Sequence, residues 1–311
     1  MTTFDGFTQS DFDAFEEQKW ASNAFNLERL EVKLKLTALG KALVAELDSE
    51  LPEQEMGLTE ERPSIFNQHK VDCMTLYFLR NEESRHELGM ILDKTKSIAE
   101  HVNDPALHHR HINLAVSIHS RGVDAGLWLH KNAWVDWNNL VERCREYWER
   151  DNLSDILKSL PESIQYCYGE SMRPDTQAAR DVSTEEVIDG FSKAGFWSIF
   201  GEAIPRMDKD LASSELVARL SQLLKILVPL HTFIGWRRDN DFHQLKEVLK
   251  EQKEKAQRKF SSVKPGDEVR ILKGLATGRV GVIEALERKG VVKVRLGAML
   301  VSLKIDELGK P

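Results

Sequence analysis

The sequence predicts an α+β fold in three parts: an N-terminal helix-plus-antiparallel-sheet domain, a helical middle segment and a small C-terminal β-barrel. Three patterns carry this prediction. Leucines recur at helical spacing in residues 23–47, apolar and polar side chains alternate in residues 109–130, and β-forming residues punctuated by glycines dominate the C-terminal stretch. The expected boundaries are residues 1–150, 151–260 and 261–311, and the middle part is expected to end in a charged helix.

A long amphipathic helix over residues 23–47 is the first expected element. Its apolar side is marked by leucines at roughly helical spacing, namely Leu27, Leu30, Leu34, Leu39, Leu43 and Leu47. We expect a loop over residues 51–63 and then a strand over residues 71–79, where the side chains alternate. Asn81 follows as a good N-cap for the next helix.

A β-hairpin is the clearest local structure in the first part, because residues 109–119 and 123–130 each alternate strictly. With a two-residue loop at residues 121–122, all apolar side chains fall on one face. That register pairs Ile118 with Ala125, Val116 with Leu127, Leu114 with Leu129, Asn113 with His130, and His119 with Asp124. A slip by one residue pair stays open.

The middle part is expected to be helical. Ser183 and Glu186 have the spacing of a capping box that opens one helix. A second helix starts at Ser213 or Ser214, is apolar nearly all round, and is expected to be buried and kinked near Pro229. Residues 243–259 alternate in charge, which predicts an exposed helix.

Charge is unevenly distributed along the 311 residues, whose formal net charge is −7. Residues 244–311 carry 16 basic and 9 acidic residues, a net charge of +7, and the remaining residues carry 27 and 41, a net charge of −14. A basic segment joined to an acidic body suggests an anionic partner for that segment. A solvated charged helix is the simpler explanation.

The N-terminus and the cysteines point to the cytoplasm. The first residues have neither the basic nor the apolar region of a secretion signal. The three cysteines, Cys73, Cys144 and Cys167, are far apart and form no CxxC pair, which fits a reducing compartment. The most apolar stretch, residues 216–236, contains two charges and a proline, so we expect no membrane span.

The C-terminal stretch carries the most informative motif. Residues Lys264 to Gly274 read KPGDEVRILKG and residues Thr277 to Ile283 read TGRVGVI, which together resemble a KOW motif. This motif belongs to the SH3-like barrels of NusG-type elongation factors and several ribosomal proteins. Residues 292–303 and 306–308 look like the closing strands and are also similar to the KOW-like domain of MutS-related ATPases that act on ribosomes.

The resemblance implies an SH3-like barrel and a partner that is RNA, a ribonucleoprotein or a protein of the transcription or translation machinery. A purely structural appendage is a third possibility. Glycines suit the turns and close approaches of such a barrel, at Gly274, Gly278 and Gly281. Basic side chains are expected to form a positive rim that binds nucleic acid or a partner, from Arg270, Lys273, Arg279, Lys289 and Lys293.

A second resemblance involves the N-terminus. Phe4, Gly6 and Phe7, followed by the spacing of Asp11, Phe12 and Phe15 and by a later His108-His109 strand, look like the uncharacterised bacterial YktB-like proteins. That resemblance leaves out residues 51–102. It implies an α+β fold and no established chemistry.

A set of histidines is the only candidate for catalysis. The predicted hairpin places polar residues on one sheet face, where they could act as ligands or proton carriers: His109, His111, His119, His130 and Asp124. No HExxH or nucleophile motif accompanies them. A partly solvated polar sheet face explains the same alternation, so we expect no metal and no cofactor.

These observations favour a non-enzymatic regulatory or adaptor protein over an enzyme. We expect it to engage RNA or a nucleoprotein machine, a ribosome or an RNA polymerase, through its C-terminal barrel. The alternative is an enzyme that uses the histidine and aspartate face and is targeted by the barrel. The sequence does not give the oligomeric state.

Overall fold

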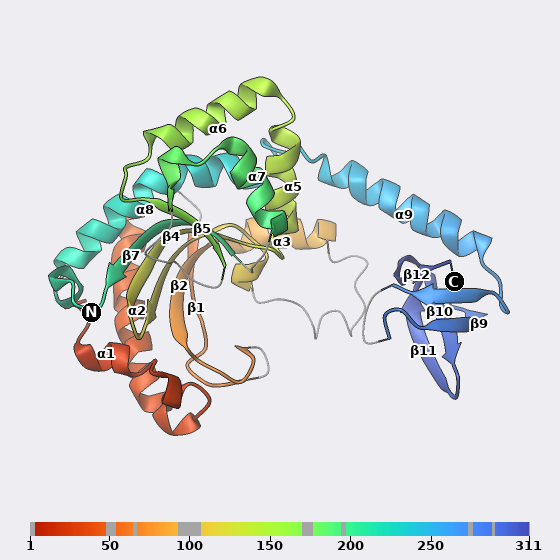
Figure 1. Cartoon of the computed structure of the whole chain (residues 1–311), viewed down its shortest axis with the longest axis horizontal. Coiled ribbons are helices and arrows are strands. Elements are labelled where there is room, and N and C mark those ends of the chain that lie inside the picture. The colour runs from red at the N-terminus through yellow and green to blue at the C-terminus, as the bar shows by residue number, and fades with distance from the viewer. Residues whose placement is uncertain are drawn as a thin grey trace. The chain divides into compact units, whose positions relative to one another are not determined.

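The computed structural model describes residues 4–47, 54–64, 67–92, 107–169, 177–193, 197–272, 276–287 and 290–310 (Figure 1). These residues form two units, Met1–His243 and Gln244–Pro311, and each unit has its own antiparallel sheet. The predicted α+β class is therefore confirmed. By their contacts, the described residues divide into two units between residues 243 and 244, where the sequence predicts three parts.

The N-terminal unit is built on seven strands: β1 (Gln54–Leu58), β2 (Cys73–Arg80), β3 (Asn113–His119), β4 (Gly122–His130), β5 (Gln165–Gly169), β6 (Gln177–Ala178) and β7 (Trp197–Pro205). They lie in the order β1-β2-β3-β4-β7-β5-β6, and all neighbours are antiparallel. Figure 1 shows a strongly curved sheet. Strands β3 and β4 are buried along almost their whole length, so both faces of the sheet centre are covered.

Two expectations about this sheet need correction. Strand β1 lies within the segment predicted to be a loop, and β5, β6 and β7 lie within the segment predicted to be helical. β7 pairs with β4 over nine residues, from Gly122 opposite Pro205 to His130 opposite Trp197. The middle segment therefore completes the sheet of the N-terminal unit, and its strands are stabilised by pairing with residues distant in sequence.

The helices of this unit are α1 (Gln9–Asp13), α2 (Asn26–Leu47), α3 (Glu82–Leu92), α5 (Trp134–Arg143), α6 (Tyr147–Ser159), α7 (Thr184–Lys193) and α8 (Glu215–Ile234). Two predicted caps are confirmed. Asn81 Oδ1 accepts a hydrogen bond of 2.8 Å from the Ser84 amide at the start of α3. Ser183 Oγ accepts one of 3.1 Å from the Glu186 amide, and Glu186 accepts one of 3.0 Å from the Ser183 amide.

The predicted leucine stripe of α2 divides between two sides of the helix. Leu39, Leu43 and Leu47 are buried, together with Val32 and Leu36, in the main core. The earlier leucines face solvent with large exposed fractions, 75% for Leu27, 41% for Leu30 and 63% for Leu34. The helix exists as expected, but its buried side begins with Arg29 and Val32, and Leu27, Leu30 and Leu34 lie outside it.

The hairpin also exists, in a register that differs from the predicted one by one residue pair. Ile118 lies opposite Val123, Val116 opposite Ala125 and Leu114 opposite Leu127, so the pairing is shifted by two residues. The loop consists of residues 120–121 instead of 121–122. A shift of two keeps every side chain on its predicted face, because side chains alternate with a period of two.

Helix α8 packs against α2, β4 and β3, and its apolar side chains belong to the main core of the N-terminal unit. Among the described helices, α8 alone is long and apolar enough to cross a membrane, and half of its most apolar window is buried inside the structure. A buried core helix passes the same test by length and composition.

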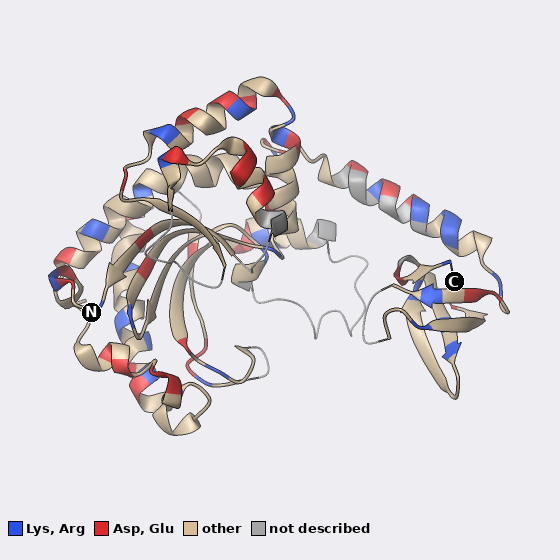
Figure 2. Ribbon diagram, in the orientation of Figure 1, with Lys and Arg blue, Asp and Glu red and all other residues tan. Residues whose placement is uncertain are grey.

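The C-terminal unit consists of helix α9 (Leu245–Ser262) and five strands: β8 (Glu268–Ile271), β9 (Val280–Leu286), β10 (Val291–Leu296), β11 (Met299–Lys304) and β12 (Leu308–Gly309). The strand order is β11-β10-β9-β8-β12. Phe260 and Val263 pack on the apolar core of this sheet, so the end of α9 belongs to the unit. Figure 2 shows acidic and basic residues mixed along α9, as the sequence predicts.

Candidate functional site

The histidines predicted to share one site separate into three groups. His109, in a short 3-10 helix, stacks on His130 at the end of β4, with ring centroids 4.1 Å apart and planes 14° apart. His108 stacks on Tyr77 of β2 with centroids 4.5 Å apart. Trp197 lies edge-on to His130 at 4.7 Å. We call these rings, with Trp128, the aromatic cluster.

The imidazoles of the aromatic cluster are neutral near pH 7. Burial lowers the pKa of His108 to about 3, and the nearby His109 and His130 lower it further. Burial likewise lowers the pKa of His109 to about 4 and that of His130 to about 3. Across the described ranges, no three histidine, cysteine or acidic side chains are arranged to hold a metal ion. We therefore interpret the stacking of these rings as packing within a buried core.

His119 and Asp124 form the second group. His119 Nε2 lies 3.2 Å from Asp124 Oδ1, and His119 Nδ1 accepts a hydrogen bond of 3.2 Å from the Arg121 amide. The imidazole therefore bridges the hairpin loop and β4. Cys73 lies opposite His119 on β2, but burial and the charge of Asp72 raise the pKa of its thiol to about 12, so it stays protonated.

His111 is alone in the third group. Its pKa is lowered by burial and then by the charges of Arg80, Arg110 and Arg85. Arg80 itself binds Asp136 of α5. The structure therefore brings His109 to His130 and His119 to Asp124, but it does not assemble the five predicted residues into one site.

The basic residues of the C-terminal unit differ in how far they are neutralised within it. Arg270 on β8 and Arg279 before β9 are exposed. Lys293 on β10 forms an ion pair of 2.8 Å with Glu287, which raises its pKa. Lys273 and Lys289, with Gly274, lie outside the described residues.

Two predicted turn glycines occupy positions that need glycine, for different reasons. Gly278 has a φ of +85°, in the left-handed region that other residues rarely adopt. Gly281 lies in β9, where a Cβ would be 2.6 Å from Val294 Cγ1 and 2.7 Å from the Arg295 carbonyl oxygen. The first glycine shapes the turn between β8 and β9, and the second lets β9 approach β10.

A feature that sequence reasoning missed is the exposure of aliphatic side chains on this sheet. Residues at alternate positions of β8 and β9 point away from the core, and some of them are aliphatic. The exposed aliphatic side chains of the unit include Leu272, Val280, Val282 and Leu300. The same period-2 alternation that predicts strands could have revealed them, because apolar residues occupy both parities of β9.

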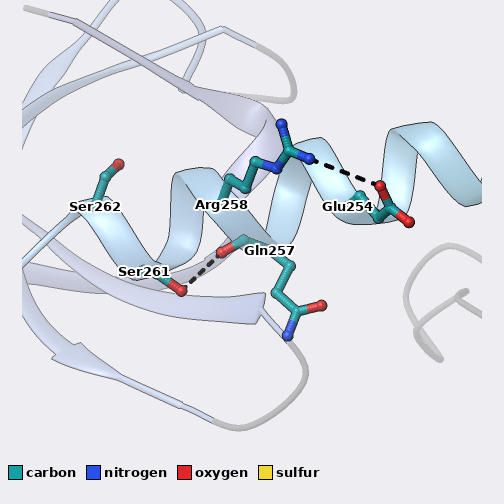
Figure 3. Close-up of a pocket in the computed structure, with 5 residues that line it drawn as sticks. All are labelled: Glu254, Gln257, Arg258, Ser261 and Ser262. Carbon is teal, nitrogen blue, oxygen red and sulfur yellow. Dashed lines mark hydrogen bonds and ion pairs between the residues drawn. The ribbon is translucent and has the colours of Figure 1, made fainter.

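Two of the hollows on the described surface are formed by helices. One, of about 510 Å³, is lined by five residues of α9 alone, shown in Figure 3: Glu254, Gln257, Arg258, Ser261 and Ser262. Arg258 Nη2 lies 3.9 Å from Glu254, and Ser261 Oγ donates to the Gln257 carbonyl at 3.0 Å. The other, of about 740 Å³, lies between Glu46 of α2 and the outer side of α8. Neither contains a histidine or cysteine.

No protein-family model and no curated protein matches this chain.

Proposed function

We propose that this chain is a non-enzymatic, cytoplasmic regulatory or adaptor protein. It engages a nucleoprotein machine, a ribosome or an RNA polymerase, or RNA, through residues 244–311. In this proposal the five-stranded sheet is a KOW-like, SH3-like barrel. Its antiparallel order and the glycines of the β8–β9 turn support that assignment.

The carrying observation is the pair of exposed arginines beside the β8–β9 turn. Arg270 lies on β8 opposite Val280, and the amide of its neighbour Ile271 donates to the Arg279 carbonyl at 2.9 Å. No ion pair joins either guanidinium to the described residues of the unit. The unit also has a net charge of +7 in sequence. Cations that are not neutralised internally attract an anionic partner.

The alternative, an enzyme on the histidine face, rests on the His119–Asp124 contact. An imidazole held by a carboxylate is a common arrangement for a general base. Here, however, Nδ1 accepts the Arg121 amide, and Nε2, 3.2 Å from Asp124 Oδ1, is buried without a hydrogen-bond partner, so neither ring nitrogen is open to a substrate. The geometry supports a structural role for His119 better than a catalytic one.

The test uses the tagged full chain in a cell extract, with and without nuclease. We expect ribosomes or RNA polymerase to be retained, and the variant Arg270→Gln/Arg279→Gln to retain them less. The matched control is Arg145→Gln, an arginine of the N-terminal unit whose side chain is 70% exposed. Equal retention by all three proteins would contradict the proposal.

A salt series separates the two kinds of partner. If RNA is bound directly, the slope of log K against log salt falls by about 2 in the double arginine variant, since each phosphate contact contributes about 1. If the machine is held through protein, retention survives nuclease treatment.

A further inference from the structure

Strand β11 forms a free edge of the C-terminal sheet. It pairs with β10 over six residues, from Val291 opposite Lys304 to Leu296 opposite Met299, without a shift in register. The strand order of the sheet ends at β11, so no described strand lies on its other side. In the described part of the chain, no backbone hydrogen bond joins residues 299–303 to a residue outside the β10–β11 pair. Such an edge presents amides and carbonyls that can pair with another strand.

The hairpin geometry shows which backbone groups of β11 lie on the free side. Leu296 and Met299 close a loop of two residues, the first of which is Gly297 with a φ of +64°. The two residues that close such a loop bond to each other, and hydrogen-bonded pairs then alternate with non-hydrogen-bonded ones along the ladder. Every second residue from Met299 onward therefore bonds to β10. The residues between them, Leu300 and Ser302, direct their amides and carbonyls to the free side.

The other edge strands of the two described sheets are short or blocked. β6 and β12 have two residues each. β1 has five, but its Glu55 pairs with Arg85 at 2.6 Å and accepts the Glu82 amide at 2.8 Å, which ties this strand to α3. Short length and charged side chains are common protections of an edge. β11 has neither, because residues 299–303 contain no charge and no proline.

The side chains of β11 are those of a strand with neighbours. Four of the residues 299–303 are apolar, a run that is typical of strands inside a sheet. Met299 is nevertheless 61% exposed and Leu300 is 50% exposed. Val301 and Leu303 are only half-buried, although they have the parity that faces the core of the unit. A second strand along this edge would cover these side chains.

The strand is complementary to itself in an antiparallel arrangement. A two-fold axis at Val301 places this residue opposite its own counterpart and Leu300 opposite Ser302 of the second copy. Leu300 and Ser302 are the residues whose backbone groups point outward, so they form the hydrogen-bonded pairs on either side of the axis. The free groups of both edges are satisfied together.

The same register also matches the side chains. Met299 lies opposite Leu303 of the second copy, so these residues and the two copies of Val301 form an apolar row on one face. Lys304 lies opposite Ala298, so no like charges are placed opposite each other. The remaining edge of the sheet, β12, has only two residues, too few to match β11 in a head-to-tail assembly.

We propose that the chain forms a dimer in which the β11 strands of two copies pair antiparallel and join their five-stranded sheets. The inference goes beyond the proposed adaptor function and does not depend on it. The occupant is a second copy because its own β11 supplies an uncharged edge of the same length, the matching apolar row and a register without charge repulsion. This pairing leaves neither copy with a free β11 edge.

The test is sedimentation velocity of the full chain at about 1–100 μM, where a dimer of modest affinity dissociates. We expect the mass to rise with concentration from the 35.6 kDa of one chain toward twice that value. The variant Leu300→Lys/Ser302→Lys places lysine opposite lysine twice across the axis and should weaken the dimer about tenfold. Leu300→Lys/Ser302→Glu places lysine opposite glutamate twice and should dimerise more tightly than the double-lysine variant.

The matched control is Val282→Lys/Leu286→Lys, which adds two lysines at exposed positions of β9, inside the sheet, and should leave the equilibrium unchanged. If the double-lysine variant fails to fold, Ser302→Pro repeats the test, because it removes an outward amide and no bond to β10. A chain that stays monomeric throughout, even one whose edge binds a foreign segment, would overturn the inference. Equal weakening by the control, or a double-lysine dimer as tight as the wild type, would also overturn it.

Discussion

Arg80 Nη2 lies 2.5 Å from Asp136 Oδ1, and both side chains are buried. The same carboxylate accepts hydrogen bonds from the Ile112 amide at 2.9 Å and the Trp236 amide at 2.7 Å. It therefore ties together the end of β2, the start of β3, α5 and the segment that leaves α8. Burial raises the pKa of Asp136, and the Arg80 charge opposes that shift.

Removing the carboxylate should destabilise the N-terminal unit strongly. Asp136→Ala leaves the Arg80 guanidinium buried without its counter-ion, which costs about 3–5 kcal/mol of unfolding free energy. Urea unfolding followed by tryptophan fluorescence measures this loss. The control is Lys225→Ala, which breaks an exposed ion pair with Glu46 and should cost less than about 1 kcal/mol. Similar losses in the two variants would contradict the conclusion that the Asp136 carboxylate holds these segments together.

The buried histidines predict that stability falls as the solution is acidified. The pKa is lowered to about 3 for His108 and His130 and to about 4 for His109, whereas an ordinary histidine titrates near 6.5. Below pH 6.5 the unfolded chain therefore binds protons that the folded chain does not. The free energy of unfolding consequently decreases as the pH is lowered. Each group contributes at most about 1.4 kcal/mol per pH unit. Urea midpoints between about pH 7 and pH 5 measure the slope.

His108→Phe is the matched variant for this pH dependence. Phenylalanine keeps the stacking on Tyr77 but does not titrate, and it removes His108 Nδ1, which is buried without a hydrogen-bond partner. We expect the variant to be as stable as the wild type at neutral pH and to lose less stability on acidification. An unchanged slope would show that His108 titrates normally.

Local signals predicted local features of this fold well. The caps at Asn81 and Ser183 and the faces of the hairpin follow from short-range spacing, and the structure has them. The hairpin register was not fixed by its own sequence, because a shift of two residues leaves every apolar side chain on the same face. What selects the observed register is the set of neighbours, β2 on one side and β7 on the other.

Features that depend on distant residues were not predictable in the same way. Strand β7 contains Gly201, which pairs with Gly126 of β4, and a Cβ at Gly126 would lie 2.7 Å from the Gly201 Cα. Two glycines weaken a strand pattern in sequence, yet here they permit close approach of two strands. The candidate histidines were likewise placed on one face by alternation along a strand. In the structure β3 begins at Asn113, so His109 and His111 precede the strand and do not follow its alternation.

The two turn glycines should differ in their cost of substitution. Gly281→Ala places a Cβ against Val294 and the Arg295 carbonyl, and overpacking of this kind costs about 1–3 kcal/mol. In Gly278→Ala the new Cβ has no atom within 4 Å, so the loss of stability comes only from the positive φ and is about 1–2 kcal/mol. Thermal unfolding of the full chain, monitored by hydrogen exchange in residues 268–309, measures the loss of stability in both variants. A larger effect at Gly278 would contradict the close approach of β9 and β10.

The two sides of α2 give the last prediction, because its leucines looked equivalent in sequence. Leu36 has no exposed surface and lies in the main core, so Leu36→Ala should lower the free energy of unfolding by about 2–5 kcal/mol. Leu34, two residues earlier, is 63% exposed, and Leu34→Ala should change stability by less than about 0.5 kcal/mol. Urea unfolding of the two variants measures the difference. A large loss of stability in Leu34→Ala would mean that the exposed side of α2 is covered in solution, because truncating a solvent-exposed leucine removes no buried contacts.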